Sequence, residues 1–254
     1  MKAALIVLFF ITALLYASVG FGGGSTYTAL LAISGANYLI IPTISLACNI
    51  LVVSSNSVHY FRVGLISLPK VWPFLVLSVP LAWVGGRIPI NETYFIGLLA
   101  LSLFFAGISM LRKTKAETHP SSKSNALWTN TIIGGGLGLL SGIVGIGGGI
   151  FLAPILHFTK WGKVREIAAL CSLFILVNSL SGLWGQLTKL GDLDLLVQAK
   201  SYWLLLPAVL VGGFIGNRLS LKLFSENTVR KLTALLVLFV AVRLLFKFCR
   251  LTFT

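Results

Sequence analysis

The chain has 254 residues, of which 57% are hydrophobic and only 10% are charged, whereas an average soluble domain is about 25% charged. This composition excludes a soluble globular protein and predicts an all-α, polytopic membrane protein embedded in a lipid bilayer. The 20 basic and 6 acidic residues give a net charge of +14, which we attribute to loops that flank membrane helices and not to nucleic-acid binding. A positive field that attracts an anionic substrate is the alternative explanation.

Apolar segments bounded by charged and turn residues predict ten helices. In chain order they span residues 3–19, 25–33, 39–60, 69–84, 93–111, 127–144, 150–158, 167–187, 202–217 and 227–248. The segments 25–33 and 150–158, at about 1.5 Å per residue, are too short to cross a hydrocarbon core of about 30 Å. The sequence therefore predicts about eight transmembrane helices plus two short half-helices.

Three blocks of sequence recur in the same order in both halves of the chain. GFGGGS at 20–25 returns as GIGGGI at 145–150, Asn56–Ser57 as Asn178–Ser179, and PLAWVGG at 80–86 as PAVLVGG at 207–213. This order predicts two homologous repeats, a first transmembrane repeat at 1–111 and a second at 127–254, joined by a polar linker at 112–126. Four full spans per repeat would make the repeats parallel, whereas a crossing by a short helix would make them inverted.

The basic residues also bear on orientation in the inner (plasma) membrane of a prokaryote, where we expect the chain to reside. They favour a cytoplasmic location for both termini and for the linker. Lys160, Lys163, Arg165, Arg218 and Lys222 lie in loops that this assignment places on the opposite side. The orientation therefore stays open.

The glycine clusters break both charge-free stretches immediately before the short helices. Free N–H groups and the positive dipole end at a helix start attract anions, and glycine lets a ligand approach the backbone closely. Ser25 adds a hydroxyl group in the first half that its counterpart Ile150 cannot offer. Close packing of helices through small residues is the alternative. The sequence thus predicts anion binding at Gly22, Gly23, Gly24, Ser25, Gly147, Gly148 and Gly149.

Polar side chains inside two of the long apolar segments are further candidates. They are Asn49, Asn56 and Ser57 in 39–60, and Ser172, Asn178 and Ser179 in 167–187. Buried amides and hydroxyls need hydrogen-bond partners, which a bound oxyanion or a neighbouring helix would equally supply. His59 and His157 are candidate carriers of a coupling proton, although interfacial positions at helix ends explain them as well.

An enzymatic role finds little support. Ser25, Ser141, His59 and His157 supply the residue types of an intramembrane hydrolase, but neither serine lies in a GxSxG motif and no acidic residue lies in those spans. The three cysteines, Cys48, Cys171 and Cys249, lack metal-ligand spacing. We therefore expect no enzyme activity, no metal and no cofactor.

The glycine motifs carry a resemblance to a known family. GFGGGS at 20–25, GIVGIGGGIFLAPIL at 142–156 and the duplicated layout resemble the sulfite exporter TauE/SafE family, also called the toluenesulfonate uptake permeases. The resemblance covers nearly the whole chain, and Phe21 and Ser25 depart from the aliphatic residues of the second motif, so that the two half-sites are unequal.

The resemblance implies a secondary transporter of small sulfur-containing anions such as sulfite, sulfoacetate or other organosulfonates. Export is the favoured direction, by alternating access, with a proton or sodium ion as the coupling ion and with a homo-oligomer as a further expectation. The alternatives are an anion channel or a membrane assembly protein without coupled transport.

Overall fold

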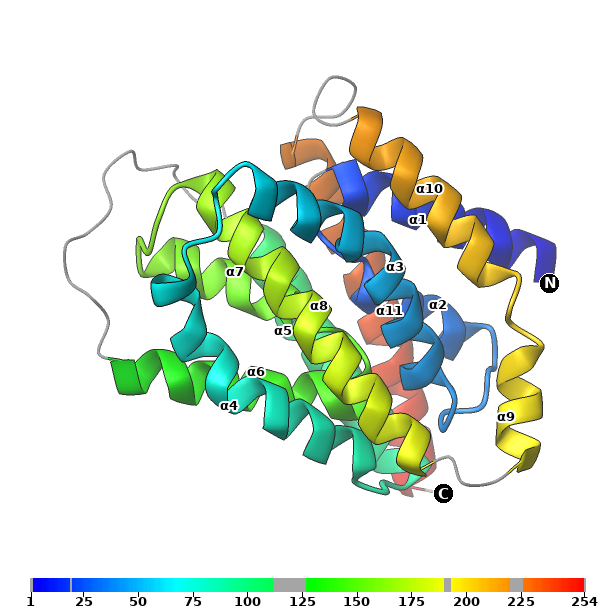
Figure 1. Ribbon diagram of the computed structural model, residues 1–254. Helices are drawn as coiled ribbons and strands as arrows, with labels where there is room; N and C mark the ends of the chain where they lie inside the picture. Colours follow the sequence, from blue (N-terminus) through cyan, green and yellow to red (C-terminus); the bar gives the residue numbers. More distant parts are fainter. Residues whose placement is uncertain (1, 19, 112–126, 190–192, 220–225, 254) are drawn as a thin grey trace.

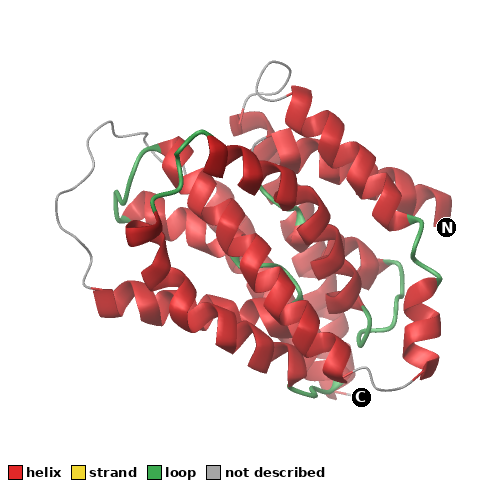
Figure 2. Ribbon diagram, viewed as in Figure 1, coloured by secondary structure: helices red, strands yellow, loops and turns green. Residues whose placement is uncertain are grey.

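A computed structural model describes residues 2–18, 20–111, 127–189, 193–219 and 226–253 (Figure 1). The described residues form helices joined by loops, without a strand among them (Figure 2), which confirms the all-α prediction. The helices are α1 (Lys2–Ser18), α2 (Gly24–Ile33), α3 (Ile41–Arg62), α4 (Leu68–Arg87), α5 (Glu92–Leu111), α6 (Leu127–Val144), α7 (Gly149–Phe158), α8 (Val164–Lys189), α9 (Leu193–Lys200), α10 (Leu205–Leu219) and α11 (Glu226–Phe253).

Five of these helices, α3, α4, α5, α6 and α8, are each long and apolar enough to cross a membrane. Together with the shorter α1 and α10 and the more basic α11, they are the eight longer helices that the sequence predicts. The short helices α2 and α7 have 10 residues each, about 15 Å in length. The chain is therefore an integral membrane protein with two half-length helices.

The sequence analysis missed one helix, α9 (Leu193–Lys200), which lies between the predicted helices 167–187 and 202–217. Charged residues at both ends and a length of 8 residues hide its apolar positions from a search for membrane spans. Its Gln198 accepts a hydrogen bond from the Asn37 side-chain amide at 3.2 Å. The helix therefore lies against the loop between α2 and α3.

The centre of the fold is an antiparallel pair, α3 and α8. Ser57, near the end of α3, hydrogen-bonds Ser172, near the start of α8, at 3.0 Å. Leu46, near the start of α3, lies beside Gly182 towards the end of α8. Figure 1 shows the two helices crossing the middle of the molecule.

Glycines let α6 pack closely against α4. Gly134 faces the backbone of Phe74 and, two turns later, Gly142 faces the carbonyl of Ala82. A Cβ at either glycine would overlap these backbone atoms. The two helices therefore approach each other through small residues, as membrane helices commonly do. Because the residue numbers rise together, the two helices run parallel.

The same arrangement joins α1 and α10. Gly212 faces the carbonyl of Phe10, and Gly216 faces the backbone of Leu14 one turn later. These helices are therefore also parallel. Each of the two tight pairs thus combines one helix from the first half of the chain with one from the second.

Each tight pair also runs parallel to the central helix that it touches. Between α8 and α4, Ser181 contacts Val79 and Gly185 contacts Trp83. Between α3 and α10, Val52 contacts Gly213 and Ser55 contacts Asn217. In both cases the residue numbers rise together along the two helices. The last pair, α5 and α11, is antiparallel and lies against α7 and α2 respectively; Glu92 and Lys247 form an ion pair across it at 2.9 Å.

The directions of the helices follow from these contacts. α1, α3 and α10 run one way, and α4, α6 and α8 run the other way. Because α1 and α3 are parallel, the chain returns across the molecule between them through α2 and its flanking loops, and it does the same through α7. Matching helices of the two halves, such as α3 and α8, are antiparallel, so that the predicted repeats would be inverted. The division at 1–111 and 127–254 stays a prediction, and the linker 112–126 lies outside the described residues.

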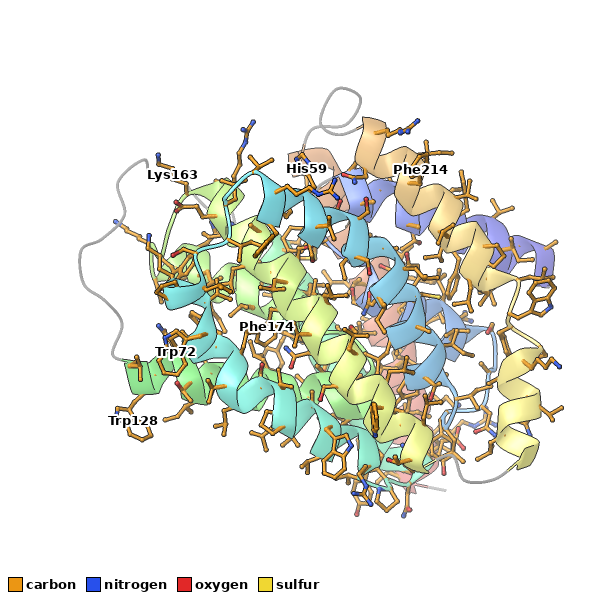
Figure 3. All side chains as sticks on the ribbon, viewed as in Figure 1. His59, Trp72, Trp128, Lys163, Phe174 and Phe214 are labelled. Atoms are coloured by element: carbon orange, nitrogen blue, oxygen red, sulfur yellow. The ribbon has the colours of Figure 1, made fainter. Side chains whose placement is uncertain are left out.

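The fold also bears on the expected orientation of the ends. The N and C ends lie at one end of the bundle, whereas the end of α5 and the start of α6, which flank the linker, lie at the other (Figure 1). This arrangement disagrees with an even number of crossings per half, on which the assignment of the termini and the linker to one side depends; the linker itself lies outside the described residues. Lys160, Lys163 and Arg218 lie at the same end as Leu111, and Figure 3 shows Lys163 and His59 along that edge.

Candidate functional site

Both predicted helix breaks are present, and glycine conformation builds them. Gly23 and Gly148 precede α2 and α7 with φ of 92° and 77°, in the left-handed region that favours glycine. Neither helix start has a side-chain cap, and the first N–H groups of a helix have no partner within the helix. Two helix starts thus present backbone donors that the local sequence leaves unpaired.

The two breaks meet at the middle of the central helix pair, on Asn49. A Cβ added to Gly22 would lie 2.7 Å from Asn49 Oδ1, and one added to Gly147 would lie 2.8 Å from Asn49 Nδ2. A Cβ on Gly24 would overlap both Asn49 and the carbonyl of Ile146. The absent side chains of three glycines therefore make room for one asparagine. Asn49 lies at mid-length of α3 (Ile41–Arg62), so the breaks lie at mid-depth of the bundle.

Asn49 links the two halves directly. Its Nδ2 donates to the Ile146 carbonyl at 3.2 Å, in the break before α7. Its Oδ1 is buried and has no hydrogen-bond partner among the described residues. The sequence predicted Asn49 as a site residue but gave no indication that it reaches the second break.

A hydroxyl pair, which the sequence analysis missed, reinforces this junction. Ser45 donates to the Gly24 carbonyl at 3.0 Å, and Thr28 donates to Ser45 at 2.9 Å. Thr28 lies 3.5 Å from the carbonyl oxygen of Gly145 in the other break. Ser45 is four residues before Asn49, on the same face of α3, and that spacing would have identified it.

Two of the remaining predicted polar residues lie at the breaks. Ser179 Oγ lies 3.3 Å from the Cβ position of Gly147, is buried, and has no partner among the described residues. Ser25 is buried in the first turn of α2, and its Oγ lies 3.5 Å from the Tyr16 hydroxyl. Ile175 supplies the apolar wall, since it contacts the Cβ positions of Gly22, Gly147 and Gly149.

The other predicted polar residues bond away from the glycines. Asn56 donates to the Ala17 carbonyl at 3.4 Å, and Asn178 donates to the carbonyl of Phe174 on its own helix at 2.8 Å. Ser57 and Ser172 bond to each other. The alternative interpretation, hydrogen bonding within the protein, therefore accounts for these contacts in this conformation, although the buried Asn178 Oδ1 has no hydrogen-bond partner among the described residues.

The two histidines lie away from the breaks. His59 is exposed near the end of α3 beside Tyr60, about 15 Å along the helix from Asn49. His157 lies near the end of α7, about 12 Å from Gly149. The structure does not bring either histidine to the glycines, and their role in coupling stays a prediction.

The electrostatic character of the site comes from dipoles. The segments 3–61, 125–159 and 167–188 contain no Asp, Glu, Lys or Arg, and these segments supply both breaks and the residues around them. Gly22–Gly24 and Gly147–Gly149 are all buried. An anion bound here would be held by uncharged donors, and its entry would require the surrounding helices to separate.

Known proteins give a consistent identity. The family model described as "Sulfite exporter TauE/SafE" matches residues 5–244. The chain is 32% identical over 244 residues to a protein of Sinorhizobium fredii named "Probable membrane transporter protein y4hK", covering 95% of this chain and 97% of that protein. It is 33% identical over 111 residues to a "Probable membrane transporter protein" of Haemophilus influenzae, covering 42% of this chain and 41% of that protein.

No solved structure matches the chain, so the identification depends on sequence. Both named relatives are described as membrane transporters, in agreement with the helices of membrane-spanning length. The family model covers nearly all of the chain, including both glycine breaks and the central helices. This chain is therefore a member of the sulfite exporter TauE/SafE family of membrane transporters.

Proposed function

We propose that the chain is a secondary transporter of small sulfur-containing anions, such as sulfite, sulfoacetate or other organosulfonates, in a prokaryotic inner membrane. The anion would bind between the two glycine breaks, on backbone N–H groups at the starts of α2 and α7. The family description supports the substrate class and favours export. The observation that carries the proposal is that two breaks, far apart in the sequence, meet on Asn49 at mid-depth of the bundle.

Site geometry of this kind suits an anion for a physical reason. A charged side chain is costly in the interior of a membrane protein, whereas helix starts and backbone donors attract negative charge without carrying a full positive charge. Binding by dipoles also leaves the anion free to depart, because no ion pair has to be broken.

The packing suggests which parts would move in alternating access. Tight glycine contacts join α4 with α6 and α8, and α10 with α1, while Gly213 of α10 lies in ordinary contact with Val52 of α3. Each of these groups mixes helices from both halves of the sequence. We therefore propose that the moving bodies are these two groups, and not residues 1–111 against 127–254. The two groups of helices meet along α3 and α8, where Ser57 hydrogen-bonds Ser172. Breaking this bond would cost little free energy, because water can take the place of either partner.

Transport by purified protein in proteoliposomes tests the function. We expect saturable uptake of labelled sulfite or sulfoacetate, and exchange of internal labelled substrate for external unlabelled substrate. A channel would show neither saturation nor exchange, and an assembly protein would show no flux. Imposing a pH gradient or a sodium gradient in separate experiments would identify the coupling ion. Absence of flux with every sulfur anion would contradict the proposal.

A further inference from the structure

We infer that Asn49 Oδ1 favours an anion that carries its own hydrogen-bond donor, so that sulfite is bound as the hydrogen sulfite monoanion, in preference to the dianion and to organosulfonates that lack such a donor. This inference depends on the proposed function, because it specifies the chemical form of the substrate at the same site. It follows from the direction in which the buried polar groups are oriented and from the absence of ionisable side chains in the surrounding segments.

The orientation of the Asn49 amide is determined by its neighbour. The Ile146 carbonyl accepts but cannot donate, so the group that approaches it at 3.2 Å must be the Asn49 NH2. Asn49 Oδ1 then faces the other way, towards Gly22, whose Cβ position lies 2.7 Å from it. This carbonyl oxygen is a pure acceptor, is 0% exposed, and has no partner among the described residues.

A second unpartnered group lies at the same place. Ser179 is 0% exposed, and its Oγ is also without a partner among the described residues. The Cβ position of Gly147 lies 3.3 Å from Ser179 Oγ and 2.8 Å from Asn49 Nδ2. Ser179 therefore lies on the Nδ2 side of the Asn49 amide, whereas Asn49 Oδ1 faces Gly22. The Ser179 hydroxyl can donate or accept, so Asn49 Oδ1 is the group of the two that only an O–H or N–H of a ligand can satisfy.

A fully deprotonated oxyanion fits this arrangement poorly. Its oxygens are acceptors only, and would lie against the Asn49 oxygen without a hydrogen between them. A dianion would also bring two negative charges into a site whose surrounding segments contain no Lys or Arg, and burial without a counter-charge disfavours the more highly charged form. Protonation of sulfite, which occurs near neutral pH, removes one charge and supplies the missing donor.

Equilibrium binding to the purified protein tests the inference without any gradient. We would measure the dissociation constants of sulfite and of methanesulfonate by calorimetry, about one pH unit below and about one unit above the second ionisation of sulfite. Because the hydrogen sulfite fraction falls about tenfold over this range, the apparent dissociation constant of total sulfite should rise about tenfold. Methanesulfonate keeps one charge throughout, so its affinity should not change.

Two variants test whether the Asn49 acceptor provides the selection. Asn49→Ala should weaken hydrogen sulfite binding several-fold more than methanesulfonate binding, because it removes the carbonyl acceptor that only hydrogen sulfite can satisfy. Asn217→Ala is the matched control, since Asn217 bonds to Ser55 on α3 at 2.7 Å, away from the breaks. Its ratio of the two affinities should equal that of the native protein. Equal weakening of both ligands by Asn49→Ala would assign that residue a packing role and overturn the inference.

The outcomes separate this inference from the proposed function. Sulfite affinity that is constant or increases with pH would overturn the selection of hydrogen sulfite while leaving a sulfur-anion transporter in place. A parallel fall in methanesulfonate affinity would assign the pH effect to the protein and would also overturn the inference. If neither ligand binds at either pH, the proposed function itself fails.

Discussion

Asn49 donates its side-chain amide to the carbonyl of Ile146 across 97 residues of sequence, at 3.2 Å. This bond connects the central helix of the first half to the glycine break of the second half. Its counterpart in the alignment that pairs Asn56 with Asn178 is Cys171, which lacks an amide. The two breaks are therefore joined by an asymmetric contact, although Gly20 and Gly23 share a left-handed φ with their counterparts Gly145 and Gly148. Substitutions on either side of this contact should separate binding from folding.

Gly22→Ala tests whether the space beside Asn49 is used for binding. Gly22 does not have a left-handed φ, so alanine introduces no backbone strain, but its Cβ would lie 2.7 Å from Asn49 Oδ1. We expect normal membrane insertion and a fall in substrate affinity of about tenfold, equivalent to about 1.4 kcal/mol. Gly136→Ala is the control, because no atom lies within 4 Å of the added Cβ. If Gly22→Ala binds and transports like the native protein, the anion site lies elsewhere.

Gly148→Val tests the start of α7. Gly148 has φ of 77°, and an added Cβ would lie 2.8 Å from Phe174 Cε1. A β-branched residue is strained at this φ and also obstructs the helix start, so we expect transport to be abolished. Gly64→Val has the same kind of strain at φ 73° in open space, and it should retain transport in proteoliposomes. Equal loss in both variants would attribute the effect to backbone strain.

Much of the fold could be predicted because its main features are local. Glycine clusters between apolar segments locate the breaks, and the predicted helices 25–33 and 150–158 differ by one residue from α2 and α7. The repeated Gly-Gly pairs also have matching neighbours. Gly85 and Gly212 face α6 and α1, whereas Gly86 and Gly213 face α8 and α3.

The directions of the helices could not be predicted in the same way. They depend on whether a 10-residue helix with its loops returns the chain across the bundle, which the length of the helix does not reveal. The same limit applies to side chains. Asn49 and Asn178 are both amides in apolar helices, but only packing decides that Asn49 reaches another segment while Asn178 bonds to its own helix.

Gly138→Val tests the close packing of α6 against α4 independently of binding. A Cβ on Gly138 would overlap the backbone of Ser78, which cannot move without displacing the helix. Over-packing of this kind costs about 1–3 kcal/mol, so the melting temperature of the purified protein should fall. Gly136→Ala, on the open side of the same helix, should leave it unchanged or slightly raised, because alanine favours helix more than glycine does. An unchanged melting temperature in Gly138→Val would contradict the packing described for these helices.

Asn49→Asp tests the electrostatic character of the site. An aspartate has nearly the same shape, but burial without a counter-charge favours its neutral form, so its charge develops only as the pH rises. We expect methanesulfonate binding to weaken with increasing pH in Asn49→Asp, because the ionised carboxylate repels the anion, whereas the native protein should show no such loss. Asn217→Asp is the control, because Asn217 bonds to Ser55 on α3 at 2.7 Å, away from the breaks. Native affinity in Asn49→Asp throughout the pH range would show that no anion binds beside this residue.

The final prediction concerns orientation in the membrane, which the fold now constrains. Cys249 is exposed near the end of α11, whereas Leu127, half exposed at the start of α6, lies at the opposite end of the bundle. The described ends on the Leu127 side carry a cluster of basic residues, Arg62, Lys70, Lys160, Lys163, Arg165 and Arg218. The opposite end carries Arg87, Lys189, Lys200, Lys247 and Arg250 among the described residues. From the preference of Lys and Arg for the cytoplasm, we expect the Leu127 side to face inward, because the sequence adds Arg112, Lys113, Lys115 and Lys123 next to it.

A membrane-impermeant maleimide should therefore label Cys249 in intact spheroplasts. A Leu127→Cys, Cys249→Ser variant should be labelled only after permeabilisation. Cys48 and Cys171 are buried, so they should contribute little background. Labelling of both positions from the same side would contradict an odd number of crossings in each half. It would then also contradict the antiparallel arrangement of α3 and α8, which brings the two breaks together at Asn49.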